Sequence, residues 1–133
     1  MDFIERFRGA IRIKTDWPAG ALPGNAEAEA PLLHFQDFLK ENYPLFHQAV
    51  ERWSPGPYAL IYRWPGTDGG AGQAGNGTDD GPVLILAHYD VVPTEREKWR
   101  ADPFGAEMKD GFIYGRGTLD MKGILMAVME GAE

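Results

Sequence analysis

The chain has 133 residues, of which 44% are hydrophobic, and it carries a formal net charge of -7. This length suits one domain with a packed core. The negative charge, with no block of lysine and arginine, disfavours nucleic acid and anionic membranes as partners. Because the chain contains no cysteine, disulfides, thiolate metal sites and a cysteine nucleophile are excluded, and any metal must be bound by His, Asp or Glu.

The amino-terminal sequence predicts a helix and no targeting segment. Apolar residues at helical spacing indicate an amphipathic helix of about three turns: Phe3, Ile4, Phe7, Ala10 and Ile11. The same stretch has no apolar run of signal-peptide length, and no later stretch is long enough to span a bilayer. We therefore expect a soluble, cytoplasmic protein with no membrane partner.

A second helix is predicted for residues 29–42, EAPLLHFQDFLKEN. Its apolar residues share one side: Leu32, Phe35, Phe38 and Leu39. Pro31 is tolerated in the first turn of such a helix, because the first-turn N–H groups have no partner within the helix. Pro44 marks the end of this helix.

Two strands are predicted next, YALIYRW (Tyr58–Trp64) and PVLILAH (Pro82–His88). The second strand is almost continuously apolar, which is typical of the centre of a sheet that is covered on both faces. Residues 65–81 between the strands are glycine-rich and polar, so we expect a flexible hairpin loop or a surface insertion there.

The last part of the chain predicts a hairpin and a helix. Asp110 and Gly111 stand between two short extended runs, which is the usual signal for a β-hairpin. The sequence MKGILMAVMEGAE then follows Asp120 with a helical pattern. Helices and strands interleave along the chain, so the predicted fold class is α/β, a sheet with helices packed on its faces.

His88 and Asp90 follow directly on the apolar strand. Ligands of open α/β sheets bind at the carboxyl ends of such strands. Side chains two residues apart in an extended chain point to the same side, so Asp90 could orient the His88 ring through one nitrogen while the other binds a metal. The alternative is an ordinary structural pair of a histidine and a carboxylate.

The sequence GRGTLDMKG supplies a second candidate ligand, Asp120. Gly115 and Gly117 permit a tight backbone around Arg116, and Asp120 falls where the last helix should begin. Asp120 could cap that helix or bind a metal. The two roles are compatible, because a helix N-terminus stabilises the ionised carboxylate that a metal also needs.

LILAHYDVVP, Trp99 and DPFGAEMKDGFIYGRGTLDMKG together resemble the amino-terminal catalytic part of the zinc-dependent M20 peptidase and amidohydrolase family. The resemblance runs from about residue 82 to residue 133, and RFRGAIRIKT resembles the first helix of the family. HYDVVP and GRGTLDMKG are most similar to the carboxypeptidase S and N-acyl-amino-acid hydrolase branch. The resemblance implies that residues 1–133 form a truncated zinc-exopeptidase-like catalytic domain, with a mixed central sheet, flanking helices and no lid or dimerisation domain.

The same resemblance implies roles for individual residues. His88 would be a terminal ligand of one zinc ion, and Asp120 would bridge two. Asp90 would belong to the catalytic set as the partner that orients His88. Two such ions activate water and polarise an amide carbonyl, and cobalt or manganese could replace zinc. A cis peptide bond between Asp120 and Met121 is also implied.

The resemblance implies that the remaining metal ligands and the general base correspond to positions beyond Glu133. His34 and His47 precede His88 and are expected to be structural. We therefore expect a parent enzyme that hydrolyses peptides or N-acyl-amino acids through two zinc ions, and a 133-residue chain that is inactive alone. Apolar surface left exposed on the last helix would favour self-association.

Two other functions are considered. The first is a noncatalytic fragment that binds metal or another protein. The second is nucleotide binding, because GAGQAG (Gly70–Gly75) formally fits the pattern G-x-G-x-x-G. That pattern needs a strand directly before it and a helix that opens at its end, and the sequence predicts neither here.

Overall fold

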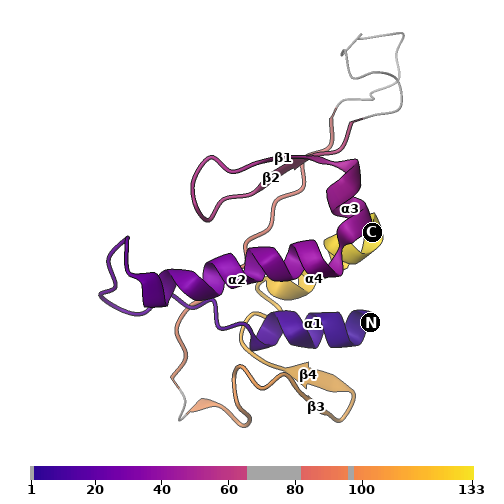
Figure 1. The fold of residues 1–133 in the computed structure, drawn as a ribbon. Helices are drawn as coiled ribbons and strands as arrows, with labels where there is room; N and C mark the ends of the chain where they lie inside the picture. The colour runs from indigo at the N-terminus through magenta and orange to yellow at the C-terminus, as the bar shows by residue number, and fades with distance from the viewer. Residues whose placement is uncertain (1, 66–81, 96–97) are drawn as a thin grey trace.

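The computed structural model describes residues 2–65, 82–95 and 98–133 (Figure 1). Its helices are α1 (Phe3–Arg12), α2 (Ala26–Asn42), α3 (Pro44–Ala49) and α4 (Lys122–Ala132). Its strands are β1 (Glu51–Trp53), β2 (Ile61–Arg63), β3 (Glu107–Lys109) and β4 (Phe112–Tyr114). Helices combined with small antiparallel sheets confirm the α/β class, as part of such a domain. Within the described residues, no helix is both long enough and apolar enough to cross a membrane.

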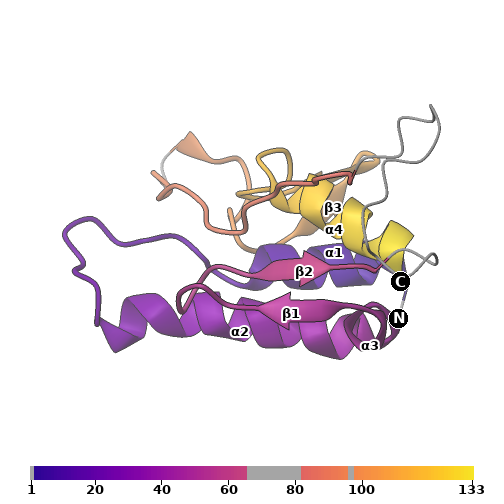
Figure 2. The same cartoon turned by 90° about the horizontal axis from the view of Figure 1, so that it is seen from above.

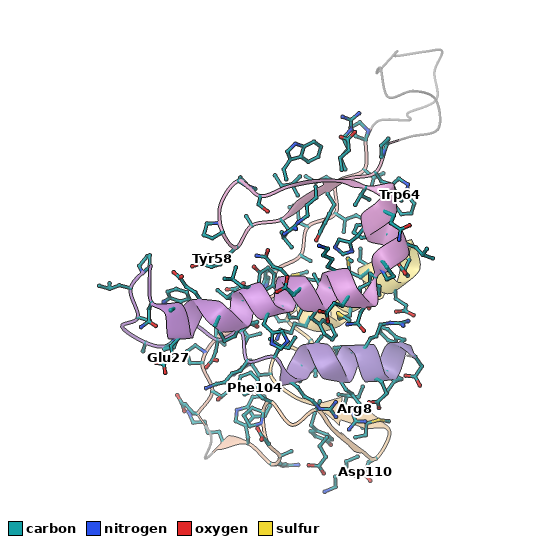
Figure 3. The ribbon with its side chains drawn as sticks, in the orientation of Figure 1. Arg8, Glu27, Tyr58, Trp64, Phe104 and Asp110 are labelled. Atoms are coloured by element: carbon teal, nitrogen blue, oxygen red, sulfur yellow. The ribbon has the colours of Figure 1, made fainter. Side chains whose placement is uncertain are left out.

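The helices form the centre of the molecule, and each hairpin lies on one side of them. α1 contacts both α2 and α4. The β1–β2 hairpin lies over α2, as Figures 1 and 2 show, and Arg52 donates to Gln36 across this contact (3.1 Å). The β3–β4 hairpin lies on the other side of α1, where Arg8 extends toward it and donates to the carbonyl of Ala106 (3.0 Å; Figure 3).

The core lies between the helices. Its buried side chains come from α1, the α2–α3 region and α4: Ala10, Ile13, Phe35, Leu39, Tyr43, Phe46, Leu125, Met126 and Met129. The Phe35 ring is fully buried and stacks on Tyr89, with 5.0 Å between the ring centroids. Through this contact the core reaches the chain segment that carries His88 and Asp90.

The first two helices are confirmed, and both are capped by side chains. Asp2 accepts a hydrogen bond from the backbone N–H of Glu5 at the start of α1. Asn25 caps α2 in the same way, so this helix begins at Ala26, and Pro31 lies in its second turn. The expectation of Pro31 in the first turn is therefore wrong. The strong helix formers of AEAEA, preceded by a cap, extend the helix past a proline that would otherwise limit it.

The hairpin at Asp110 is confirmed as well. Asp110 and Gly111 both have positive φ angles, 53° and 82°, as the tight turn between twisted strands requires. The helix predicted after Asp120 is α4. Of the predicted strand at Tyr58–Trp64, only Ile61–Arg63 form β2, which pairs antiparallel with β1, a strand that was not predicted.

The strand predicted at Pro82–His88 is not formed. In the described parts of the chain the strands make two separate antiparallel pairs, and residues 82–90 pair with neither. The side chains from Val83 to Leu86 are 62–87% exposed. An apolar pattern encodes burial, but a strand forms only beside another strand, and here the first backbone partner comes at Val91. Of the glycine-rich segment predicted at 65–81, residues 66–81 lie outside the described residues, and GAGQAG with them.

This run also changes where exposed apolar surface lies. Leu125, Met126 and Met129 of α4 are buried against the other helices, although α4 was expected to leave such surface open. Ile124 of the same helix is 54% exposed, and a longer exposed apolar run lies on the extended segment from Val83 to Leu86. We expect any self-association to use such exposed apolar surface.

Replacing Phe35 by alanine tests the link between the core and the site segment. We expect Phe35→Ala to lower the free energy of unfolding by about 3–5 kcal/mol, because a fully buried ring is lost and leaves a cavity. The matched control is Phe112→Ala, whose ring is 67% exposed on β4 and should change the free energy by about 0.5 kcal/mol or less. Urea unfolding followed by circular dichroism measures both, and equal losses would contradict this description of the core.

Candidate functional site

The structure brings the three predicted site residues together. His88 and Asp90 end the extended segment that begins at Pro82, and Asp120 lies in the loop before α4. The Nε2 atom of His88 is 3.1 Å from Oδ1 of Asp120, although the two residues are 32 positions apart. The loop and the segment therefore meet through the two side chains predicted as metal ligands.

The other nitrogen of the His88 ring faces Asp90. Nδ1 lies 3.0 Å from the backbone carbonyl oxygen of Asp90 and 3.2 Å from its Oδ1. Both ring nitrogens thus face acceptor oxygens, whereas a neutral imidazole has a single N–H. Two species satisfy both contacts: a protonated ring, or a neutral ring whose Nε2 shares a cation with Asp120. The donor set therefore fits a metal ion at the Nε2 side, with Asp90 holding the proton on Nδ1.

The carboxylates also shift the proton affinity of this ring. Partial burial acts to lower the pKa of His88, but the hydrogen bonds and charges of Asp90 and Asp120 outweigh it and raise the pKa above 6.5. The side chains remain open to solvent, with 47% of His88 and 88% of Asp120 exposed. The pair is accessible to a ligand that arrives from solution.

The described residues hold two such ligands and no complete metal cluster. No group of three or more His, Cys, Asp and Glu side chains is arranged to hold an ion in the ranges that the structure describes. A zinc site normally uses three or four protein ligands. His88 and Asp120 are fewer side chains than such a site needs.

Thr15 fixes the backbone that carries His88 and Asp90. This side chain is buried, and its hydroxyl donates to the carbonyl of Tyr89. Its own carbonyl accepts from the backbone N–H of Val91 (3.0 Å). The backbone on both sides of Asp90 is thereby bound to the segment that follows α1. Sequence reasoning missed Thr15, because nothing in RIKTD separates a buried threonine from an exposed one.

Lys122 fixes the loop that carries Asp120. Its side chain is completely buried, and its amino group donates to the carbonyls of Ala10 (3.0 Å) and Ile13 (2.7 Å) at the end of α1. Burial lowers the pKa of Lys122 to about 7, against the opposing charge of Asp16. Sequence reasoning missed this residue too, although a lone lysine at the start of the apolar run GILMAVM was a usable signal.

The capping role considered for Asp120 is wrong. The N-cap residue of α4 is Met121, and no side chain hydrogen-bonds the first turn. Asp120 lies one residue earlier and directs its carboxylate to His88. The cis peptide bond between Asp120 and Met121 is present, as the family resemblance implied.

The other histidines lie apart from this site. His47 is held by the carbonyl of Tyr43 (2.7 Å) and the hydroxyl of Tyr62 (3.1 Å), which supports the structural role expected for it. His34 is exposed on α2. Neither ring is part of a group of metal-ligand side chains within the described residues.

Comparison with known sequences identifies relatives of the chain. The profile of Peptidase family M20/M25/M40 matches residues 84–133, the part that contains the whole candidate site. Probable carboxypeptidase S-like 1 of Dictyostelium discoideum is 37% identical over 101 residues, which cover 76% of this chain and 19% of that protein. The N-fatty-acyl-amino acid synthase/hydrolase PM20D1 of Bos taurus is 34% identical over 131 residues, covering 97% and 24%. Carboxypeptidase S of Saccharomyces cerevisiae is 30% identical over 138 residues, covering 98% and 22%.

In each comparison, the aligned region covers most of this chain but a small part of the relative. Almost all of this chain aligns with the latter two relatives, but it spans only 22–24% of their lengths.

The raised pKa of His88 is open to direct measurement. In chelator-treated protein, the ring signals of His88 followed by NMR across pH should titrate above pH 6.5. We expect Asp120→Asn to lower this pKa, because it removes the charge and the acceptor that face Nε2. Asp37→Asn removes an exposed carboxylate of α2 and serves as the control, so an equal effect of the two variants would contradict the described contact.

The support from Thr15 is tested by amide exchange. Thr15→Val keeps the side-chain shape but removes the donor to Tyr89, so the Val91 amide should exchange about fivefold faster, equivalent to about 1 kcal/mol of local stability. Thr15→Ser keeps the hydroxyl and should leave most of the protection in place. If both variants exchanged at the same rate, the hydroxyl would have no role in holding this segment.

Proposed function

Because the chain belongs to the peptidase family M20/M25/M40, we propose that it carries part of the active site of a metal-dependent hydrolase. The bond cleaved is the amide bond of a peptide or of an N-acyl-amino acid. His88 and Asp120 bind the metal, and Asp90 orients His88. Zinc is the proposed ion, with two ions in the complete site, and cobalt or manganese are chemically acceptable substitutes.

One observation carries the proposal. Two residues separated by 32 positions place an imidazole nitrogen and a carboxylate oxygen 3.1 Å apart, on an exposed surface, with a second carboxylate on the far side of the imidazole. A structural histidine needs one such partner, whereas a metal-binding histidine commonly has an orienting acceptor opposite its ligand atom. The arrangement supports metal binding more strongly than either contact alone.

The residues of the chain have separate tasks in this mechanism. Asp90 keeps the proton on Nδ1 of His88, so the lone pair of Nε2 stays available. Asp120 supplies negative charge next to Nε2 of His88. With these residues holding a divalent metal, the ion would supply Lewis-acid chemistry for the scissile carbonyl and for water. Thr15 and Lys122 hold the two ligand-bearing segments and so limit how far His88 and Asp120 separate.

The proposed substrate class rests on the names of the relatives. Those names are of carboxypeptidases and of an N-fatty-acyl-amino acid synthase/hydrolase. A peptide with a free carboxyl end and an N-acyl-amino acid share one chemical unit, an amide next to a free carboxylate. We propose that this unit is the substrate feature of the site.

A noncatalytic module that binds metal is the second candidate. The observation that favours it is the absence of a third ligand beside His88 and Asp120 among the described residues. Such a module would bind a metal and cleave nothing. Metal binding alone therefore does not separate the two functions, and hydrolysis must be measured as well.

Zinc titration by calorimetry tests the metal site. We expect saturable binding that is lost in Asp120→Ala and in His88→Ala, because each removes one of two ligands. Asp37→Ala keeps the site and has the same net charge as Asp120→Ala, so it controls for general attraction of cations to an acidic chain. Zinc binding that is equal in all variants would refute the site.

Hydrolysis tests the catalytic candidate. An N-acyl-amino acid and a dipeptide are incubated with the zinc-loaded protein, with and without a chelator. Cleavage that needs zinc and is lost in His88→Ala supports the hydrolase and excludes the noncatalytic module. Zinc binding without cleavage fits the noncatalytic module and also a partial active site with two ligands, so only zinc-dependent cleavage distinguishes them.

A further inference from the structure

Arg116 has no acceptor for its guanidinium group among the described residues. Its backbone N–H donates to the carbonyl of Pro103 (2.7 Å), but its Nε atom is buried without a hydrogen-bond partner. Four other arginines of the described residues donate to side-chain oxygens: Arg6, Arg8, Arg52 and Arg63. A half-buried arginine whose buried Nε has no acceptor is notable in a chain of net charge -7, because carboxylates are plentiful.

Trp99 supports the guanidinium from one side. The Cζ atom of Arg116 lies 5.2 Å from the centroid of the Trp99 ring. An aromatic ring in this position stabilises the cation without using its N–H groups. The terminal N–H groups have no acceptor among the described residues, so they can pair with a planar anion that has two acceptor oxygens, which is the geometry in which arginine binds carboxylates.

Both residues line a cavity that reaches the candidate site. The cavity has a volume of about 300 Å³, and its lining includes Trp99, Arg116, Thr118, Leu119 and Asp120. This volume is at the lower end of the range for small-molecule sites. Leu119 is 87% exposed and adds an apolar surface next to the carboxylate of Asp120. One cavity thus combines an unpaired cation, apolar surface and a proposed metal ligand.

We propose that Arg116, supported by Trp99, binds the free carboxylate of the substrate next to the amide that is cleaved. The ligand class is a small N-acyl-amino acid or the carboxyl end of a peptide. This inference rests on the proposed function, because it assigns the carboxylate that those substrates share. Asp120 lines the same cavity and repels a free anion, so binding to the metal-free chain is expected to be weak, though specific for the carboxylate.

The experiment is an NMR titration of the full chain in the presence of a chelator. The probes are N-acetylleucine and N-acetylleucinamide. They differ only at one group, which is a carboxylate in the first and a neutral amide in the second. The side-chain Nε–H signal of Arg116 and the indole N–H signal of Trp99 are followed. We expect N-acetylleucine to shift both signals in a saturable way and N-acetylleucinamide to leave them in place. Equal shifts with both probes, or no shift with either, would overturn the inference without any variant being needed.

Two variants test the residue itself. Arg116→Lys keeps the charge but loses the paired N–H groups, so N-acetylleucine binding, read at Trp99, should weaken about tenfold. Arg63→Lys is the matched control on β2 and should bind as the unmodified chain does. Unchanged binding in Arg116→Lys would show that Arg116 has a structural role only. If Arg116→Lys fails to fold, the comparison of the two probes on the unmodified chain still tests whether the carboxylate is bound.

Zinc separates this inference from the proposed function. Carboxylate binding that persists in chelator and in His88→Ala supports the Arg116 site even if zinc does not bind. Binding that appears only with zinc, is lost in His88→Ala and is unaffected by Arg116→Lys would place the carboxylate on the metal. That result would overturn the inference and leave the proposed function standing.

Discussion

The buried amino group of Lys122 holds the two halves of the site in register. It donates to two carbonyls at the carboxyl end of α1, where helical N–H partners are no longer available. Three residues past that end, Thr15 binds the backbone on either side of Asp90. One short stretch after α1 therefore positions both the loop that carries Asp120 and the segment that carries His88. The 3.1 Å contact between those two side chains depends on this stretch.

The supports and the site differ in their environment. Lys122 and Thr15 are buried, whereas His88 and Asp120 are exposed. Burial disfavours the charged form of a lysine, and for this reason the pKa of Lys122 falls to about 7. Two hydrogen bonds and the ring of Phe35, 4.9 Å from the amino group, offset part of this cost. The chain thus keeps its rigid polar contacts behind the site and leaves the reactive groups accessible.

Local patterns in the sequence predicted what local interactions determine. The periodicity of α1 and α4 and the Asp110–Gly111 turn need no distant partner, and each was predicted correctly. The meeting of His88 with Asp120 was also predictable, but only through family resemblance, because spacing does not show which loop returns to which segment. The segment from Val83 was read as a strand because its pattern encodes burial, yet strand pairing depends on neighbours that no local pattern contains. The buried partners of Lys122 were hidden for the same reason.

The open segment before His88 also affects how firmly the site is ordered. From Val83 to Leu86 no backbone group has a hydrogen-bond partner among the described residues, while the N–H of Val91 is bound to Thr15. His88 therefore lies at a boundary between backbone that is held and backbone that is free to sample many conformations. Fixing a free residue costs about 1–2 kcal/mol in entropy, and a metal that binds His88 must supply part of it. A strand that pairs with this segment would order its backbone before the metal binds. Metal affinity would then rise although the strand makes no contact with the metal.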